Sequence, residues 1–426
     1  MAQSLECVAA GAVADIQQHQ QHFLAHASNA AILCDLYAQL FAGCGLSPAG
    51  RFAPRDPSRP LRLLYVVSSL VDGQAASANI ARFCTLHDPG RIAPHVLCVE
   101  EFTRREPPLG FLQYPEAPSV QVGRGVIDRL PAGALTMLSA RGDLLAGARQ
   151  AIGAARELGA DVAVFVGSPA CPVQAGCAFA RVAPRQINMN IGVPLPMPGI
   201  DTIIYNSPRR WLEDRSFLAS RQIGSSSVET SGGDARAGLT TLPRSRESLS
   251  IPADALALVS AGNRLPARLL AGSFLADLAI FLGSHPSARW ILIGPGNFAP
   301  VLERMGPLAQ RVITLGPVAD IRPVVKACDI FLNEYPEGGG NTVIEAMGCG
   351  VPVVALDAGP RHAQHIGAAL SGDLSLTTSK AYWERVGELG GDPGARGEVG
   401  RAQQGRAVEK LDYTAIVKAY EAVYFP

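Results

Sequence analysis

Residues 329–356 read DIFLNEYPEGGGNTVIEAMGCGVPVVAL, and this stretch decides the predicted fold. An apolar run (329–335) is followed by three successive glycines, by a segment with helical spacing (341–349) and by a second apolar run (351–356). Strand, glycine loop, helix and strand in this order form one unit of a parallel sheet with crossover helices. A helix N-terminus reached through a glycine loop is a favourable site for a phosphate group.

The glycine loop lacks the marks of two common phosphate motifs. No Gly-Lys-Ser/Thr follows it, so it is not a Walker A motif, and no G-x-G-x-x-G follows the first strand. A sugar nucleotide is the ligand that we expect. Gly339 and Gly340 would approach the diphosphate, Asn341 or Thr342 would cap the helix and donate to a phosphate oxygen, and Glu345 would bind the ribose. A plain glycine turn before a capped helix is the alternative interpretation.

The same alternation of apolar runs and helical segments extends in both directions from this stretch. In the second half we expect strands at 255–262, 288–296 and 311–316 and a helix over 267–283. In the first half we expect strands at 61–70, 95–100, 161–167, 185–192 and 201–207. This pattern predicts an α/β protein with two doubly wound, Rossmann-like domains that face a ligand cleft.

The length of 426 residues is too great for one typical core, which favours two domains. We expect a helical extension and Pro-rich linker at 1–58, an N-terminal domain at 59–250, and a C-terminal domain at 251–410. A C-terminal helix at 411–426 would pack back on the N-terminal domain. The Ser- and Gly-rich stretch 224–250 is interpreted as the connection between the domains.

Cations are needed if a diphosphate is to bind without a metal ion. Arg264 and Arg268 follow the strand 255–262, and the carboxyl end of that strand is expected to face the crevice of the glycine loop. Arginine pairs bidentately with phosphate, so both are candidate donor-binding residues. Solvated loop arginines are the alternative.

Composition excludes several classes of function. The formal net charge is zero, which argues against a nucleic-acid-binding protein. The nine cysteines are scattered, with no C-x-x-C pair, and indicate reduced thiols in a cytoplasmic protein. No basic, apolar signal peptide begins the chain, and no apolar run approaches the roughly 20 residues of a membrane span. His87 and His95 flank a loop, a position more typical of surface residues than of catalysts.

Several stretches resemble the O-GlcNAc transferase superfamily of GT-B glycosyltransferases, which includes bacterial cytoplasmic protein N-glucosyltransferases. Residues 61–97 resemble the family's first strand and helix, and 161–194 resemble the segment around its R-x-A-P-x-Q signature, here RVAPRQ at 181–186. Residues 328–356 and 359–370 resemble its donor-domain core. The similarity covers most of 61–425, and 1–58 shows no 34-residue tetratricopeptide period.

The resemblance implies roles for individual positions. It places Arg264 at the donor diphosphate, Gly340, Asn341 and Thr342 in the phosphate-binding turn, and Glu345 on the donor helix. The remaining donor positions that it suggests are Gln186, Arg361 and His362. Val318 is a further candidate for donor binding. Glu337 and Glu345 also have the E-x7-E spacing of retaining GT-B enzymes, which makes Glu337 a candidate on the sugar side.

The chain departs from the family after the first strand. Many relatives have Asp-His-Pro there, whereas this chain has Asp72-Gly73-Gln74, so the acceptor-side histidine is absent. Asp72 is the candidate catalytic base, and a turn residue in Asp-Gly is the alternative. This departure leaves the acceptor class open.

The predicted function is transfer of a sugar of the glucose or GlcNAc class from a UDP-sugar, as co-substrate, to a protein or peptide in the cytoplasm. Neither a metal ion nor another cofactor is expected, because no Asp-x-Asp motif lies in a suitable loop. The family implies inversion, whereas the E-x7-E spacing alone indicates retention. The alternatives are an accessory subunit without turnover and a transferase for a glycan or lipid-linked acceptor. The N-terminal helices could support a homo-oligomer.

Overall fold

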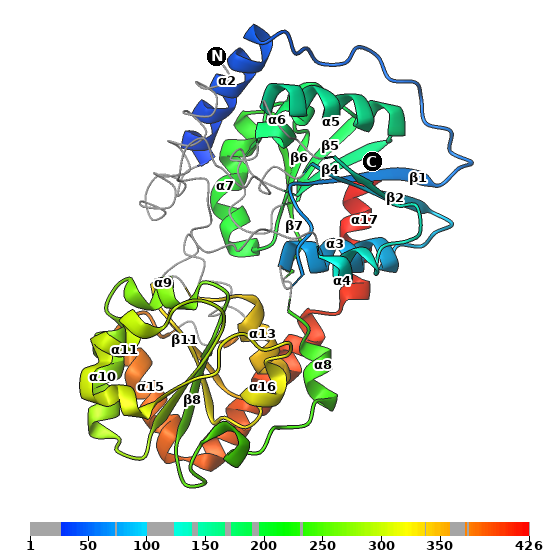
Figure 1. Cartoon of the computed structure of the whole chain (residues 1–426). Helices are drawn as coiled ribbons and strands as arrows, with labels where there is room; N and C mark the ends of the chain where they lie inside the picture. Colours follow the sequence, from blue (N-terminus) through cyan, green and yellow to red (C-terminus); the bar gives the residue numbers. More distant parts are fainter. Residues whose placement is uncertain are drawn as a thin grey trace. The chain divides into compact units, whose positions relative to one another are not determined.

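The computed structural model divides the chain into two compact units. Unit 1 comprises the residues up to Thr230 together with Tyr413–Pro426, and unit 2 comprises Ser231–Asp412. The structure describes residues 27–72, 75–99, 123–138, 144–166, 172–189, 196–230, 233–336, 338–357, 371–372 and 375–425. Each unit contains one parallel sheet with helices on both faces, as the alternating sequence pattern predicts (Figure 1).

Unit 1 is built on a seven-stranded sheet in the order β3-β2-β1-β4-β5-β6-β7. Its strands are β1 (Leu61–Val67), β2 (Ile92–Cys98), β3 (Leu135–Met137), β4 (Val162–Val166), β5 (Arg185–Met189), β6 (Thr202–Tyr205) and β7 (Gly224–Ser227). Every pairing is parallel. The chain moves outward from β1 in one direction and from β4 in the other, so the order of strands reverses between β1 and β4.

The helices of unit 1 cover both faces of this sheet. They are α2 (Ala27–Gly43), α3 (Ala75–Leu86), α4 (Arg124–Ile127), α5 (Leu144–Leu158), α6 (Pro172–Phe179), α7 (Pro208–Ser220) and α17 (Tyr413–Tyr424). Helices α5 and α6 lie on one side of the sheet, and α3 and α17 lie on the other (Figure 1). Tyr37 and Phe41 of α2 are buried in the core of this unit, whereas Leu36 is 43% exposed.

Unit 2 is built on a five-stranded parallel sheet in the order β10-β9-β8-β11-β12. Its strands are β8 (Ala257–Ala261), β9 (Arg289–Ile293), β10 (Val312–Thr314), β11 (Ile330–Asn333) and β12 (Val353–Ala355). Its helices are α8 (Ala235–Thr240), α9 (Leu265–Leu270), α10 (Phe274–Ser284), α11 (Ala299–Met305), α12 (Arg322–Val325), α13 (Asn341–Gly348), α15 (Ser379–Gly391) and α16 (Pro393–Lys410), with 3-10 turns η1 (Glu247–Leu249) and η2 (Gly306–Arg311). The order of strands reverses between β8 and β11.

Three local expectations differ from the structure. The helix expected over 267–283 is two helices, because Gly272 has a φ of +73° and ends α9 before α10 begins. The Ser-rich stretch expected to connect the domains begins with strand β7, which lacks apolar alternation and forms by pairing with β6. Strand β3 was also absent from the expected set.

The division between the units falls at Thr230, earlier than the expected boundary at residue 250. The segment after it joins unit 2 because α8 packs closely on α13. A Cβ on Gly238 would collide with the backbone of Gly348, and one on Gly233 would approach the backbone oxygen of Asn341 to 2.7 Å. These glycines admit close contact between the two backbone segments.

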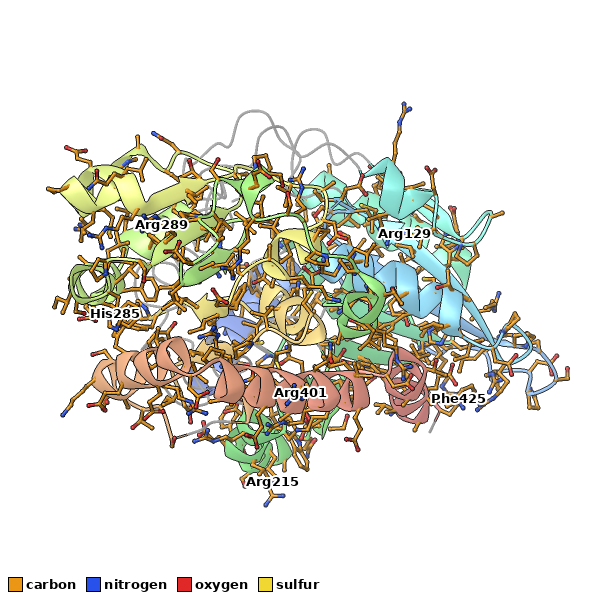
Figure 2. All side chains as sticks on the ribbon, turned by 90° about the horizontal axis from the view of Figure 1, so that it is seen from below. Arg129, Arg215, His285, Arg289, Arg401 and Phe425 are labelled. Atoms are coloured by element: carbon orange, nitrogen blue, oxygen red, sulfur yellow. The ribbon has the colours of Figure 1, made fainter. Side chains whose placement is uncertain are left out.

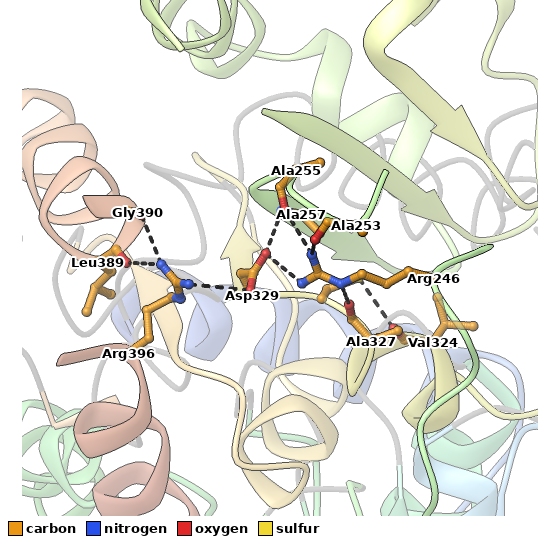
Figure 3. A network of polar contacts seen from close by, with 11 residues as sticks. Arg246, Ala253, Ala255, Ala257, Val324, Ala327, Asp329, Leu389, Gly390 and Arg396 are labelled. Carbon is orange, nitrogen blue, oxygen red and sulfur yellow. Dashed lines mark hydrogen bonds and ion pairs between the residues drawn. The ribbon is translucent and has the colours of Figure 1, made fainter. Parts of the chain in front are cut away.

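A partly buried aspartate joins the central strands of each sheet at their amino ends. Asp329 precedes β11, and its carboxylate accepts hydrogen bonds from the Ala257 backbone N–H and from Arg246, both at 2.8 Å (Figure 3). Arg396 of α16 lies 3.7 Å away on the other side of the carboxylate. In unit 1, Asp161 precedes β4 and contacts the Arg62 N–H at 2.8 Å in the same way. These contacts fix strand pairs β8–β11 and β1–β4, whose carboxyl ends face the opposite edge.

The C-terminal helix α17 packs in unit 1. Tyr420 and Tyr424 are buried, and Tyr413 accepts the guanidinium of Arg82 over its ring, 4.5 Å from the centroid. The side chain of Phe425, labelled in Figure 2, lies beneath the guanidinium of Arg91, 5.1 Å from its ring centroid. The chain therefore returns to the first unit after completing the second.

Candidate nucleotide-sugar site

The two sequence stretches selected as candidate site loops meet at the point where the strand order of unit 2 reverses. One loop follows β8 and begins at Gly262, and the other follows β11 and begins at Glu334. Strands β8 and β11 are direct neighbours, so both loops leave the same edge of the sheet side by side. In open α/β sheets, this position is the usual ligand crevice.

Arg264 and Arg268 differ in exposure. Arg264 occupies the N-cap position of α9 and is exposed. Arg268 is 9% exposed, and its guanidinium donates to the Gly338 carbonyl oxygen at 2.6 Å and pairs with the Glu334 carboxylate at 2.6 Å. The two arginines predicted to have the same role are thus placed differently by the structure.

The glycine loop has a defined backbone conformation. Gly338 has a φ of +54°, in the left-handed region that favours glycine. The N–H of Gly339 donates to the side-chain oxygen of Asn333, at the end of β11, over 2.6 Å. Gly340 is the N-cap of α13 and supplies no side-chain cap. The expectation that Asn341 or Thr342 caps the helix is therefore wrong, because both already belong to its first turn.

The candidate residues on α13 directly follow the glycine loop. Asn341 and Thr342 are half-buried in the first turn, and Glu345 is half-buried one turn further along. The pKa of Arg322 is raised, chiefly by its hydrogen bond to Asp320 and in smaller part by the nearby Glu345. Glu345 thus lies within the electrostatic reach of a cation at the start of α12.

Val318 lies in the loop after β10 and is half-buried. Because β10 runs parallel to β8 and β11 through β9, this loop leaves the same edge of the sheet. The structure therefore places the described donor candidates of unit 2 along one edge. Glu337, Arg361 and His362 lie outside the described residues.

Sequence reasoning missed the residues that support the glycine loop from below. The hydroxyl of Tyr335 donates to Asp277 of α10 at 2.7 Å and accepts from the Trp383 indole N–H at 2.7 Å. Burial and the Asp277 hydrogen bond raise the pKa of the Tyr335 hydroxyl. Asn333 and Glu334 are polar residues at the end of an otherwise apolar strand, and this was the signal that could have identified them.

Gln186 in unit 1 is held by hydrogen bonds within the protein. It is fully buried, and its side-chain N–H groups donate to the backbone oxygens of Ala178 and Gly199, both at 2.7 Å. Its side-chain oxygen accepts from the Val182 N–H at 2.9 Å. These bonds use both N–H groups of the side-chain amide. They give Gln186 a structural role in place of the expected role in binding the nucleotide-sugar, because they connect the end of α6 to β5 and to the 196–200 loop.

Asp72 follows β1 at the point of strand reversal in unit 1 and is exposed. Its carboxylate accepts from the backbone N–H of Val126 at 2.8 Å and of Gly125 at 3.2 Å, in the first turn of α4. The carboxylate thus serves as a cap for a neighbouring helix. This corresponds to the structural interpretation of Asp72 rather than to a base directed at an acceptor.

The described residues contain no helix long and apolar enough to cross a membrane. Within the same residues, no group of three or more His, Cys, Asp and Glu side chains could hold a metal ion.

Comparison with known proteins identifies the class of fold. Residues 266–377, which contain the glycine loop and Arg268, match the family model of glycosyl transferases group 1. The two α/β units have the GT-B fold, in agreement with the sequence prediction. The match to group 1 glycosyl transferases, together with the GT-B fold, supports a sugar-transferase function for the chain.

Particular solved structures extend this comparison. The chain is similar to a point mutant of the O-GlcNAc transferase of Thermobaculum terrenum, with a TM-score of 0.63 and 17% identity over 98% of this chain and 81% of that one. Anabaena HepE in complex with UDP matches with a TM-score of 0.61 and 17% identity, over 85% and 99% of the respective chains. Sucrose-phosphate synthase of Thermosynechococcus elongatus matches with a TM-score of 0.57 and 15% identity, over 85% and 98%. No curated protein sequence matches the chain.

Proposed function

We propose that the protein transfers a glucose- or GlcNAc-class sugar from a UDP-sugar to a protein or peptide acceptor in the cytoplasm. The observation that carries the proposal is the meeting of the Arg264 loop and the glycine loop between β8 and β11, within the matched segment 266–377 and its immediate flank. The similarity to HepE, whose structure contains UDP, supports the choice of nucleotide. The similarity to an O-GlcNAc transferase supports a sugar of the GlcNAc class.

The proposed chemistry follows from where negative charge develops. The bond between the sugar C1 and the β-phosphate oxygen breaks, a bond from C1 to the acceptor forms, and the acceptor loses a proton. UDP gains negative charge as it leaves. The exposed Arg264 and the N-terminus of α13 at Asn341 would stabilise that charge more strongly in the transition state than in the bound substrate. Glu345 would accept hydrogen bonds from the ribose hydroxyls, and we propose inversion at C1.

This arrangement would operate without a divalent cation, because the guanidinium and the helix N-terminus supply positive charge at the diphosphate. UDP release would then continue in the presence of EDTA. An absolute requirement for Mg²⁺ or Mn²⁺ would contradict this part of the proposal.

The experiment measures UDP release from UDP-glucose and UDP-GlcNAc by the purified full chain, with and without host lysate as the source of acceptor. UDP affinity is measured in parallel for the wild type and for Arg264→Ala and Asn341→Ala. Arg401, an exposed arginine on α16, provides the matched control Arg401→Ala (Figure 2). We expect weaker UDP binding in the first two variants and unchanged binding in the control. Unchanged affinity in both site variants would show that the donor site is misplaced.

A second candidate function is an accessory subunit that binds the nucleotide without turnover. The capping role of the Asp72 carboxylate favours it, because this residue was the candidate base. Clear UDP binding without release from any donor or with any lysate would support the accessory function. Acceptor-dependent UDP release would exclude it.

A further inference from the structure

The guanidinium of Arg268 occupies the narrow space between the two loops of the candidate site. A Cβ added to Gly262, at the end of β8, would collide with its Nη2 atom, and one added to Gly339 would lie 3.6 Å from its Nη1 atom. Arg268 itself belongs to α9, the helix that follows β8. One side chain of α9 therefore lies between the loop after β8 and the loop after β11.

The positive charge of Arg268 is already matched within the protein. Glu334 is 1% exposed, and its Oε1 atom lies 2.6 Å from Nη2 of Arg268. A carboxylate so deeply buried requires a cation in contact with it. The same guanidinium donates through Nη1 to the Gly338 carbonyl oxygen, so a planar fork holds two groups at once.

The bond to Gly338 acts on the backbone that leads into α13. Gly338 has a φ of +54°, in the left-handed region, and as a glycine it has no side chain whose contacts could hold this conformation. Its carbonyl is held by Arg268, and the N–H of the next residue, Gly339, is held by Asn333. Three glycines in succession would otherwise leave the helix N-terminus without a fixed approach.

We infer that Arg268 is a positioning residue, which uses its ion pair with Glu334 to hold the Gly338–Gly340 loop in the conformation that presents the N-terminus of α13 to the donor. This inference rests on the proposed UDP-sugar site and deepens it. It separates Arg268 from Arg264, because a direct phosphate ligand would have to release its buried partners.

The two roles predict opposite effects of removing Glu334. If Arg268 contacts phosphate directly, Glu334→Ala frees the guanidinium and removes a nearby negative charge, so UDP should bind more tightly. If Arg268 positions the loop, Glu334→Ala loosens the guanidinium and UDP should bind about tenfold more weakly. Glu334→Gln, which keeps an acceptor oxygen, should restore part of the affinity. Arg268→Met should lower UDP affinity as Glu334→Ala does. Arg268→Lys should recover little of that affinity, because an ammonium group lacks the planar pair of N–H donors of a guanidinium.

The chain offers a matched control at the other end of the same sheet. Arg246 pairs with the partly buried Asp329 at 2.8 Å and donates to three backbone carbonyl oxygens. Arg246→Met should therefore destabilise unit 2 without changing UDP affinity. Comparison at equal folded fraction, from thermal unfolding, separates loss of stability from loss of positioning.

Hydrogen–deuterium exchange of a peptide covering 331–348, without any nucleotide, tests the loop directly. We expect faster exchange in Arg268→Met and Glu334→Ala than in Arg246→Met, and Arg268→Lys provides the same measurement if Arg268→Met does not fold. Unchanged exchange in every variant, or tighter UDP binding by Glu334→Ala, would overturn the inference. If the wild type binds no UDP-sugar but exchange responds as expected, the proposed function fails and the positioning role stands.

Discussion

The imidazole of His87 and the carboxylate of Glu421 lie 2.8 Å apart, although 334 positions separate them in the sequence. His87 is 5% exposed at the end of α3, and Glu421 belongs to the C-terminal helix. An ionised carboxylate only accepts, so Nδ1 of His87 donates to Glu421 and Nε2 accepts from the Tyr65 hydroxyl at 2.8 Å. The hydrogen bond fastens α17 to the first unit.

This pair predicts a pH dependence for the stability of unit 1. Burial lowers the pKa of His87 below its ordinary value near 6.5, although the Glu421 hydrogen bond opposes the shift. The imidazole of His87 therefore binds a proton more readily in the unfolded chain than in the folded chain. The free energy of unfolding falls as the pH drops below about 6.5, by at most about 1.4 kcal/mol per pH unit. The surrounding groups are Glu421, Arg91, Tyr65 and Tyr424.

Urea unfolding of the wild type and of His87→Gln between pH 7.5 and 5.5 checks this prediction. His87→Gln should be less stable than the wild type at pH 7.5, and the difference should narrow at pH 5.5. The acid sensitivity of a His95→Gln variant is a useful comparison, because burial alone lowers the pKa of His95. Equal acid sensitivity in the wild type and His87→Gln would assign the effect to another group.

Gln186→Ala should destabilise unit 1 by about 1–3 kcal/mol, because it removes three hydrogen bonds to the backbone and takes the acceptor away from the buried Val182 N–H. UDP affinity of the folded fraction should not change, since the side chain faces the protein interior. Chemical unfolding followed by UDP titration measures both. Gln150, exposed on α5 in the same unit, gives the control Gln150→Ala, which should be nearly neutral. Selective loss of UDP binding by Gln186→Ala would restore the ligand-binding interpretation.

The fold was predictable because its signal is local. Apolar runs followed by glycine and a helical period recur along the chain. They predicted both β8 and β11, together with the loop that follows each strand. The strands that escaped prediction, β3 and β7, are short edge strands. Strand β7 reads GSSS and owes its conformation to pairing with β6, which no property of its own residues indicates.

Site roles were harder to predict because they depend on which partner a side chain finds. Arg264 and Arg268 both follow the same strand, and the sequence does not distinguish their roles. Only the fold shows that the Glu334 carboxylate lies 2.6 Å from the guanidinium of Arg268. His87 looked like a surface loop residue, because its partner Glu421 follows more than three hundred residues later. A motif predicts the type of residue, whereas tertiary contacts decide whether it faces a ligand or the protein.

Asp72→Asn should retain most of the transferase activity, if the carboxylate acts as a cap, because an amide oxygen still accepts a backbone N–H. Asp72→Ala should lower the stability of unit 1 by about 1 kcal/mol through loss of that cap. Steady-state UDP release and thermal unfolding measure the two effects. A fall in kcat of about a hundredfold or more for Asp72→Asn, with stability unchanged, would instead identify Asp72 as the general base.

Gly262→Ala should weaken UDP binding, because the added methyl group would displace the Arg268 guanidinium from Glu334. Displacement leaves a buried carboxylate without its cation, so unit 2 should lose about 3 kcal/mol or more. Gly283 gives a matched control, because it lies in α10 with open space around it. Gly283→Ala should stabilise the unit by about 0.5–1 kcal/mol, since alanine favours the helix, and should bind UDP as the wild type does. Both variants are compared by thermal unfolding and UDP titration, and equal UDP affinity in the two would show that the space between the loops tolerates a shifted Arg268.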